Sequence, residues 1–316
     1  MLRRALLASL ALPAVAHAQP RWPSRPVRFI VPFAPGGPVE IPARFLAEQL
    51  TQSLGQPVIV ETRGGAGGAI GAQAVIAAQD GHTFLFTTGA IAIQPALQPE
   101  IGYDPLRDFL PVSLVSESPM GFAARPGNRF GSLAGLIAAA KADPGALTIG
   151  SSGTGTTTHM VGALFGMKAG IALTHVPYRG AGQMVGAFLA GDIDLMSAEL
   201  STILPHVREG RAVVLGQTGA GRSPVLPEVP TLAELVPGTA MPIWFALLGN
   251  RGTPPEVVAR LGEAMAPLRQ GSVLAARMAE NGASLLLTGP EVLAWRLAEE
   301  VPLWRQVVQQ AGIKPD

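Results

Sequence analysis

The chain has 316 residues, enough for about two domains, and 48% of its residues are hydrophobic while only 14% are charged. This composition excludes a disordered or strongly charged tail protein. The formal net charge of +1, without runs of Lys and Arg, argues against a nucleic-acid binder. The absence of cysteine excludes disulfides and thiolate metal sites. The 38 glycines and 29 prolines have no three-residue period, so they predict many tight turns.

The N-terminus has the three parts of a secretory signal peptide, which we assign to residues 1–18. Arg3 and Arg4 supply the positive start, an apolar stretch follows, and an Ala-His-Ala site precedes the expected cut after Ala18. The apolar stretch is too short to span a bilayer core of about 30 Å, and it contains Pro13. We therefore predict export, by either the general or the twin-arginine route.

The first part of the mature chain alternates apolar runs, glycine-rich turns and helical patterns. This order is typical of βαβ units, in which helices cover a parallel sheet. The apolar runs are nearly continuous, as in strands that are buried on both faces. The predicted strands are 27–33, 57–60 and 83–87, and the predicted helices are 41–54 and 69–79.

The same alternation continues with different loops. The predicted strands are 120–124, 147–149, 173–176, 193–196 and 244–248, and the predicted helices are 133–141, 159–169 and 183–190. From residue 255 onward the pattern is mostly helical. The fold class predicted is α/β, with two lobes, the helical C-terminus returning to the first of them.

Three common classes of site lack the residues that they need. The glycine-rich turn at 65–71 has the spacing G-x-G-x-x-x-G, and no acidic residue follows the next strand, so a nicotinamide site is not expected. No G-K-[ST] follows a glycine-rich loop, which excludes a P-loop. The histidines show no metal-ligand spacing, so no metal site is predicted.

A serine hydrolase is an alternative that the sequence leaves open. Residues 150–155 resemble a nucleophile elbow but miss G-x-S-x-G by one residue. Ser152 and His159 would be its catalytic residues, and His175 and Asp192 could join a triad, although nothing in the sequence fixes their geometry.

Three strand-to-helix loops consist mainly of small residues: 33–37, 63–68 and 150–157. Glycine lets the backbone approach a ligand closely, and a helix N-terminus attracts an anion. In open α/β sheets, ligands bind beyond the carboxyl ends of the strands, where these loops lie. The sequence therefore predicts a cleft for a small anion. Further hydroxyl donors would come from Ser151, Ser152, Thr154, Thr156 and Thr157.

Seven motifs, in order along the mature chain, resemble those of the Bug-type extracytoplasmic solute receptors of tripartite tricarboxylate transporters. They are 31–37 (VPFAPGG), 63–68 (RGGAGG), 103–105 (YDP) with 108–109 (DF), 151–159, 175–180 (HVPYRG), 222–224 (RSP) and 229–234 (VPTLAE). The resemblance implies a type II-like periplasmic binding protein whose two α/β lobes close on a ligand. Lobe 1 would comprise 19–119 and 243–316, and lobe 2 would comprise 120–242, with hinge crossings near Pro119 and Pro242.

The resemblance also implies a non-enzymatic periplasmic protein without a cofactor. Its partners would be a small organic acid and membrane transporter subunits, not nucleic acid, and we expect a monomer. A ligand-sensing partner of a membrane receptor would share the fold and stays an alternative. The implied ligand-binding residues are Phe33, Ala34, Pro35, Gly36, Gly37, Thr87, Thr88, Ser151, Ser152, Gly153, Thr154, Gly155, Thr156, His159, Tyr178, Arg179 and Gly180.

Two acidic residues depart from the family pattern. Glu40 stands where Asp is usual, and Glu199 lies where the family often has Phe and Asp. Each would select a ligand with a cationic or hydroxyl end if it faced the cleft. Alternatively, Glu40 stabilises the start of its own helix, and Glu199 is a solvated loop charge.

Overall fold

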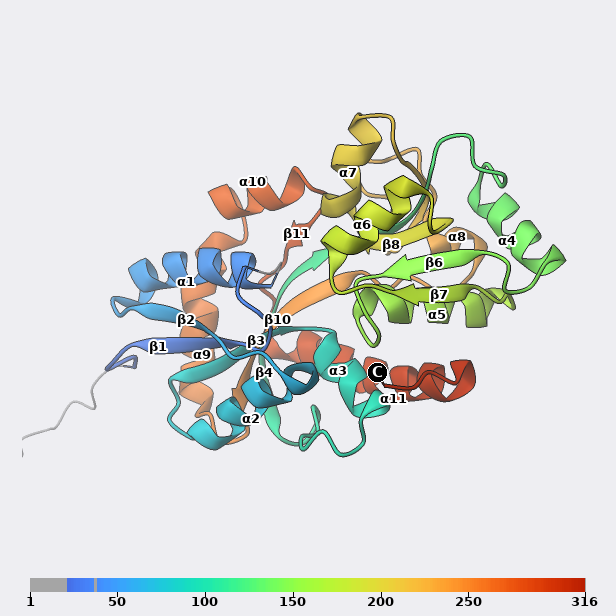
Figure 1. Cartoon of the computed structure of the whole chain (residues 1–316). Coiled ribbons are helices and arrows are strands. Elements are labelled where there is room, and N and C mark those ends of the chain that lie inside the picture. The colour runs from blue at the N-terminus through green and yellow to red at the C-terminus, as the bar shows by residue number, and fades with distance from the viewer. Residues whose placement is uncertain (1–21, 37–38, 316) are drawn as a thin grey trace, which may run out of the picture.

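The computed structural model describes residues 22–36 and 39–315, which form two α/β lobes (Figure 1). The expected signal peptide at 1–18 and the expected ligand residue Gly37 lie outside the described residues. Lobe 1 is built on a six-stranded sheet and lobe 2 on a five-stranded sheet. Among the described residues, no helix has the length and apolar character needed to cross a membrane.

The sheet of lobe 1 has the strand order β11-β4-β10-β3-β1-β2. Its members are β1 (Val27–Val31), β2 (Val58–Thr62), β3 (Thr83–Thr88), β4 (Phe109–Ser118), β10 (Ile243–Asn250) and β11 (Ser284–Leu285). Strands β2, β1 and β3 are parallel, so the carboxyl ends of all three meet at one edge. Strand β10 runs antiparallel between β3 and β4, which brings its first residues to that same edge.

The sheet of lobe 2 has the order β7-β6-β8-β5-β9. Its members are β5 (Met120–Ala124), β6 (Thr148–Ser151), β7 (Thr174–Pro177), β8 (Leu195–Glu199) and β9 (Val213–Gln217). Strands β7, β6 and β8 are parallel, and β5 pairs antiparallel with β8 and β9. The loop after β6 is therefore the counterpart in lobe 2 of the loops after β1 and β3.

Helices pack around both sheets (Figure 1). In lobe 1, α1 packs on β2, α2 on β3, and α9 on α1 and β4; in lobe 2, α5 and α6 pack on β8. The α-helices are α1 (Glu40–Leu54), α2 (Ala69–Ala78), α3 (Ala90–Leu97), α4 (Leu133–Ala142), α5 (Thr157–Ala169), α6 (Ala181–Ala190), α7 (Leu200–Arg208), α8 (Leu232–Leu235), α9 (Pro255–Met265), α10 (Val273–Ala279) and α11 (Pro290–Ala311). Two short 3₁₀ helices are η1 (Ala66–Gly68) and η2 (Ala266–Leu268).

The largest hydrophobic core follows the two central strands of lobe 1. Every residue of β3 and of β10 is buried, as the nearly continuous apolar pattern of both segments predicts. The same core continues into lobe 2 through Phe122 of β5 and Phe165 of α5, whose rings meet edge to face with centroids 5.1 Å apart. A second core around Met184 and Phe188 lies between α6 and the sheet of lobe 2.

The long C-terminal helix α11 connects the two lobes. It packs against α3 and β4 of lobe 1, as expected for C-terminal helices that return to the first lobe. It also extends beneath α5 of lobe 2, a contact that the sequence did not indicate (Figure 1). The backbone itself crosses between the sheets twice in the described chain: at Pro119, which separates β4 from β5, and in the segment before β10.

The predicted strands and helices all occur, with ends that differ by at most three residues, but six elements were missed. Prolines hid two of them: Pro95 lies inside α3, and Pro111 lies within β4. Strand β4 tolerates Pro111 at one of the two register shifts in its pairing with β10. Helix α8 and strand β11 are too short to give a periodic signal, and α7 and β9 were also missed.

Candidate ligand-binding site

A cavity of about 430 Å³ lies between the lobes at the carboxyl edges of both sheets. Lobe 1 contributes the loops after β1, β2 and β3, and lobe 2 contributes the loop after β6 and the end of β8. We call this cavity the cleft. It is lined by Pro32, Phe33, Ala34, Val39, Gly65, Gly67, Gly68, Thr88, Ala90, Gln94, Ser152, Thr154, Gly155, Thr156, Thr157, Thr158, Glu199 and Ile243.

The N-termini of four helices converge on the cleft. Val39 and Gly68 are the N-cap residues of α1 and α2, and Ala90 and Thr157 are the first residues of α3 and α5. Helix N-termini carry unpaired N–H groups and a partial positive charge. The described residues that line the cleft include no Lys, Arg or His. An anion bound here would be held by backbone dipoles and hydroxyls.

The loop from β6 to α5 depends on glycine and on a capping threonine. Gly153 and Gly155 have φ values of +137° and +71°, which L side chains rarely adopt. Thr156 then enters α5 in an extended conformation, and its Oγ1 accepts from the His159 N–H at 3.4 Å and donates to the Gly153 carbonyl at 2.7 Å. The run of Gly, Ser and Thr thus places small polar groups at the floor of the cleft.

Most hydroxyls around the cleft are bonded to the protein itself. Thr88 Oγ1 accepts the Ala90 N–H at 3.2 Å, and Thr158 Oγ1 lies 2.9 Å from both Ser152 Oγ and Thr156 Oγ1. The side chains of Thr154 and Thr157 form no hydrogen bond with any other residue that the structure describes, within 22–36 and 39–315. Their hydroxyls are therefore the ones available to a ligand.

The two lobes touch across the cleft through α3. Gln94 of α3 donates from Nε2 to the carbonyl oxygen of Gly155 at 3.4 Å. A Cβ at Gly155 would collide with the side chain of Leu97, also on α3. This close approach is a second reason for glycine at position 155, in addition to its backbone conformation.

Several residues that the sequence singled out do not line the cleft. Thr87 points to the opposite face of β3 from Thr88, because side chains alternate along a strand. Pro35 and Gly36 are exposed at the tip of the loop after β1. Gly153 braces its loop through its carbonyl oxygen, which accepts from Ser151 Oγ at 3.1 Å.

The loop after β7 braces the loop after β6 from the side. Tyr178 N–H donates to the Ser151 carbonyl at 3.1 Å, and Gly180 N–H donates to the Ser152 carbonyl at 3.2 Å. Arg179 is exposed, and its backbone N–H bonds to the side chain of Gln183 at 3.1 Å. These three predicted site residues thus pack beside the loop after β6 and do not line the cleft itself.

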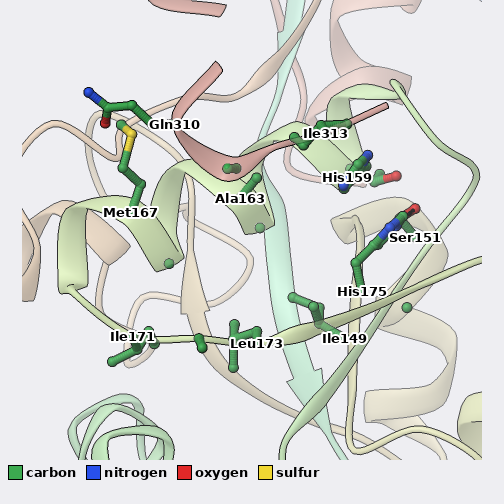
Figure 2. Close-up of a pocket in the computed structure, with 16 residues that line it drawn as sticks. Ile149, Ser151, His159, Ala163, Met167, Ile171, Leu173, His175, Gln310 and Ile313 are labelled. Atoms are coloured by element: carbon green, nitrogen blue, oxygen red, sulfur yellow. Dashed lines mark hydrogen bonds between the residues drawn. The ribbon is translucent and has the colours of Figure 1, made fainter. Parts of the chain in front are cut away.

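Ser151 and His159 line a different cavity, of about 360 Å³, between β6, α5 and the end of α11 (Figure 2). Figure 2 shows them at one end of this cavity with His175, and Met167 and Gln310 at the other. The rings of His159 and His175 stack with centroids 3.6 Å apart. His159 Nδ1 accepts the Gly155 N–H at 3.1 Å, so this group supports the cleft loop from behind.

Ser152, His159, His175 and Asp192 are not arranged as the catalytic residues of a serine hydrolase would be. Ser152 Oγ lies 2.9 Å from Thr158 Oγ1, and the serine within hydrogen-bonding distance of an imidazole is the buried Ser151, 2.7 Å from His175 Nε2. Asp192 is exposed in the turn after α6. A nucleophile needs an accessible hydroxyl beside its base.

Glu40 is held by its own segment. One carboxylate oxygen accepts the Gly36 N–H at 2.6 Å, and the other accepts from Nε of Arg44, one turn along α1, at 2.6 Å. These two hydrogen bonds hold the pKa of Glu40 below its usual value, the bond from Gly36 most strongly. The arrangement favours stabilisation of the helix start over contact with a ligand, because both oxygens are engaged.

Glu199 lies at the inner end of the cleft, where β8 meets α7. It is largely surrounded by protein, and this desolvation raises its pKa to about 7, although a hydrogen bond with Ser118 acts in the opposite direction. Glu199 is thus a desolvated carboxyl group in the wall of the cleft, and the alternative of a solvated loop charge is wrong.

Sequence reasoning missed several residues that line the cleft. Thr157 was named as a hydroxyl donor and 63–68 as a small-residue loop, but neither Thr157 nor 65–68 was included among the ligand-binding residues. Extending the hydroxyl-rich run by one residue would have found Thr158. Val39, Ala90 and Ile243 are ordinary apolar residues in the sequence, and Gln94 lies in a helix that was not predicted. No local signal identifies these four.

Comparisons with known proteins give consistent results. A family described as "Tripartite tricarboxylate transporter family receptor" matches residues 42–313. Protein BugT of Bordetella pertussis is 35% identical, over 97% of this chain and 94% of the relative. Among solved structures, R. palustris Rpa4515 with adipate has a TM-score of 0.80 and 32% identity, covering 93% of this chain and all of that one. MatC of Rhodopseudomonas palustris with bound malate has a TM-score of 0.77 and 32% identity, with coverages of 91% and 100%.

Proposed function

Because the chain belongs to the tripartite tricarboxylate transporter family of receptors, which are periplasmic solute-binding proteins, we propose that its cleft captures a small organic carboxylate. The observation that carries this assignment is the convergence of four helix N-termini on one cavity, whose lining among the described residues includes no basic side chain. A singly charged carboxylate matches partial charges and N–H donors of this kind. The adipate and malate of the related structures are both carboxylates.

The ligand would be held mainly by the loop from β6 to α5. Thr154 and Thr157 offer hydroxyls that are not engaged by the described protein, and α5 offers its first N–H groups. Opposite them, Phe33 and Ala34 after β1 and Thr88 after β3 close the other side. Ser151, Gly153, His159, Tyr178, Arg179 and Gly180 would shape this loop rather than touch the ligand.

Binding would couple to closure of the two lobes about a hinge. The proposed division is 19–119 with 243–316 for lobe 1 and 120–242 for lobe 2, and the separate sheets support it. A ligand that contacts both lobes gains more contacts in the closed arrangement, so it shifts the population toward closure. The hinge segments would lie near Pro119 and Pro242.

Export and delivery complete the proposal. The protein would be exported, cut after Ala18 and released as a monomer that carries its ligand to membrane transporter subunits. It would have no enzymatic activity and need no cofactor. A ligand-sensing role toward a membrane receptor uses the same binding step, and only the identity of the membrane partner separates the two.

Thermal unfolding of residues 19–316 tests the proposal directly. The protein is first denatured and refolded to remove bound ligand, and then mixed with mono-, di- and tricarboxylates, aromatic acids and acidic amino acids. A ligand at 100 times its dissociation constant adds about 2.7 kcal/mol of stability. A shift with one class of carboxylate supports the assignment, and a flat response with confirmed refolding contradicts it.

A pair of variants locates the site. Thr157→Val removes a hydroxyl that faces the cleft, so we expect affinity to fall about tenfold or more for a charged acceptor. Thr62→Val, at the end of β2 but not among the residues that line the cleft, is the matched control and should bind like the wild type. Equal affinities for both variants would show that the ligand lies elsewhere.

An esterase assay addresses the alternative. A carboxylate receptor should not hydrolyse generic esters. Turnover that disappears in Ser152→Ala, or in Ser151→Ala beside His175, would establish a hydrolase instead.

A further inference from the structure

A third cavity, of about 490 Å³, adjoins the cleft on the side of α1 and α10. We call it the annex. It is lined by Ile41, Pro42, Phe45, Ser118, Glu199, Ser201, Phe245, Leu274, Arg277, Met278, Glu280, Asn281 and Ala283. These residues come from both lobes, and Glu199 is the one among them that the sequence analysis singled out as a candidate site residue.

The annex is adjacent to the cleft along three elements. Glu199 lines both cavities. On β10, Ile243 lines the cleft, and Phe245, two residues further along the same face of the strand, lines the annex. At the start of α1, Val39 lines the cleft while Pro42 and Phe45 line the annex. The two cavities therefore lie side by side, and Glu199 belongs to the lining of both.

The annex differs chemically from the cleft. Its inner wall is apolar: Phe245 and Leu274 are only 4% and 7% exposed, and Phe45 and Met278 add to this wall. Arg277 and Glu280 stand exposed at its rim, and the Arg277 guanidinium lies 5.4 Å from the centre of the Phe45 ring. The cleft offers helix N-termini and hydroxyls. The annex offers an apolar wall beside Glu199, and the rest of its lining is polar or charged: Ser118, Ser201, Arg277, Glu280 and Asn281.

We propose that the annex is the second half of the ligand site, and that the ligand is an extended monocarboxylic acid with an alkyl or aryl body. This inference rests on the proposed function: the carboxylate occupies the cleft, and the apolar body passes Glu199 into the annex. The reverse orientation is disfavoured, because it would place the apolar body among the helix N-termini and hydroxyls of the cleft and leave the apolar wall of the annex without an apolar partner. Apolar walls recognise an apolar body by removing its surface from water.

A series of carboxylates of increasing length tests this proposal by titration calorimetry on residues 19–316. The series is acetate, butanoate, hexanoate and octanoate, with 4-phenylbutanoate as the aryl example and hexanedioate as the doubly charged one. Each methylene that enters the annex should increase affinity about fourfold. Hexanedioate should bind more weakly than octanoate, because its second carboxylate would enter an apolar compartment.

Two variants tie any length dependence to the annex. Ala283→Phe fills the annex and should remove most of the gain of octanoate over butanoate, while butanoate affinity stays within about twofold of the wild type. Ala276→Phe places the same side chain on the exposed face of α10, outside the annex, and should keep the wild-type profile. If Ala283→Phe does not fold, the wild-type series and Met278→Ser, which makes the wall polar, carry the same test.

The outcomes separate the two proposals. Length dependence that Ala283→Phe or Met278→Ser reduces and Ala276→Phe preserves supports the annex. Binding of short carboxylates with a flat length profile, or tighter binding of hexanedioate than of octanoate, overturns the annex and leaves carboxylate capture standing. Failure of every carboxylate to bind overturns both.

Discussion

Glu199 combines a position between two compartments with an unusual acidity. Burial raises its pKa from 4.5 to about 7, so between these values the folded protein binds a proton that the unfolded chain releases. This group therefore makes the folded state less stable as pH rises from about 4.5 to 7. The same proton decides whether the wall beside a bound carboxylate is neutral or negative.

We predict that carboxylate affinity falls as pH rises through about 7, because ionised Glu199 then repels the ligand. A loss of several-fold between pH 6 and 8 is expected, measured by calorimetry in buffers of equal ionic strength. Glu199→Gln should flatten the profile, and an unchanged slope in this variant would assign the pH effect to another group.

Glu40 shows the opposite behaviour, because its carboxylate is bonded to Gly36 and Arg44. Its pKa lies below the unfolded value, so its contribution to stability is present above that value and is lost as pH falls through the folded pKa. We predict that Glu40→Gln lowers the melting temperature at pH 7 and that the difference from wild type shrinks in acid. The order of ligand preferences should stay the same; a reordering would show that Glu40 faces the ligand.

At the scale of single elements, the loop from β6 to α5 depends on Gly155. Its φ of +71° is strained for any L side chain, and a Cβ at this position would displace the side chain of Leu97. We predict that Gly155→Ala lowers the free energy of unfolding by about 1–3 kcal/mol and weakens ligand binding. Gly186→Ala on α6, where a Cβ meets open space, is the control and should be neutral or slightly stabilising. Equal effects of the two substitutions would contradict this account of the loop.

Helix α11 is anchored to the strands next to the lobe crossings by Glu300. Its two carboxylate oxygens accept the indole N–H groups of Trp244 at 2.9 Å and Trp304 at 3.1 Å. Burial raises its pKa to about 7, although these bonds and the nearby Arg296 act against the shift. Arg296 also pairs with Glu117 at the end of β4, so α11 contacts both strands that border the crossings.

We predict that Glu300→Ala lowers the free energy of unfolding by about 3 kcal/mol, because it leaves two buried indole N–H groups without acceptors. Denaturant unfolding measures this loss. Glu299→Ala, its exposed neighbour on α11, should change stability by less than about 0.5 kcal/mol. If both variants lose the same stability, the bonds to the two indoles contribute little.

For the whole molecule, closure requires that both lobes respond to one ligand. We predict that saturating carboxylate slows amide hydrogen exchange together in the loops after β1 and β3 of lobe 1 and in the loop from β6 to α5 of lobe 2. Surface segments such as α4 should exchange at unchanged rates. Protection confined to one lobe would show that the ligand binds without bridging the cleft.

The amino-acid sequence by itself determined the α/β class, most strands and helices, and the loops that carry the cleft. These features depend on local patterns: buried strands read as apolar runs, and Gly153 and Gly155 mark backbone conformations that other residues avoid. The sequence missed α3 and β4 because Pro95 and Pro111 broke those patterns, and their surroundings in the fold compensate for them.

Only the tertiary structure decided which side chains reach the cleft. Thr87 and Thr88 are neighbours in sequence, yet strand alternation turns only Thr88 toward the cleft. The Glu40 carboxylate accepts a hydrogen bond from the nearby Gly36 N–H, whereas Glu199 lines two cavities. Burial, side-chain direction and acidity arise from segments that are distant in sequence and meet only in the folded molecule, and for this reason no local pattern encodes them.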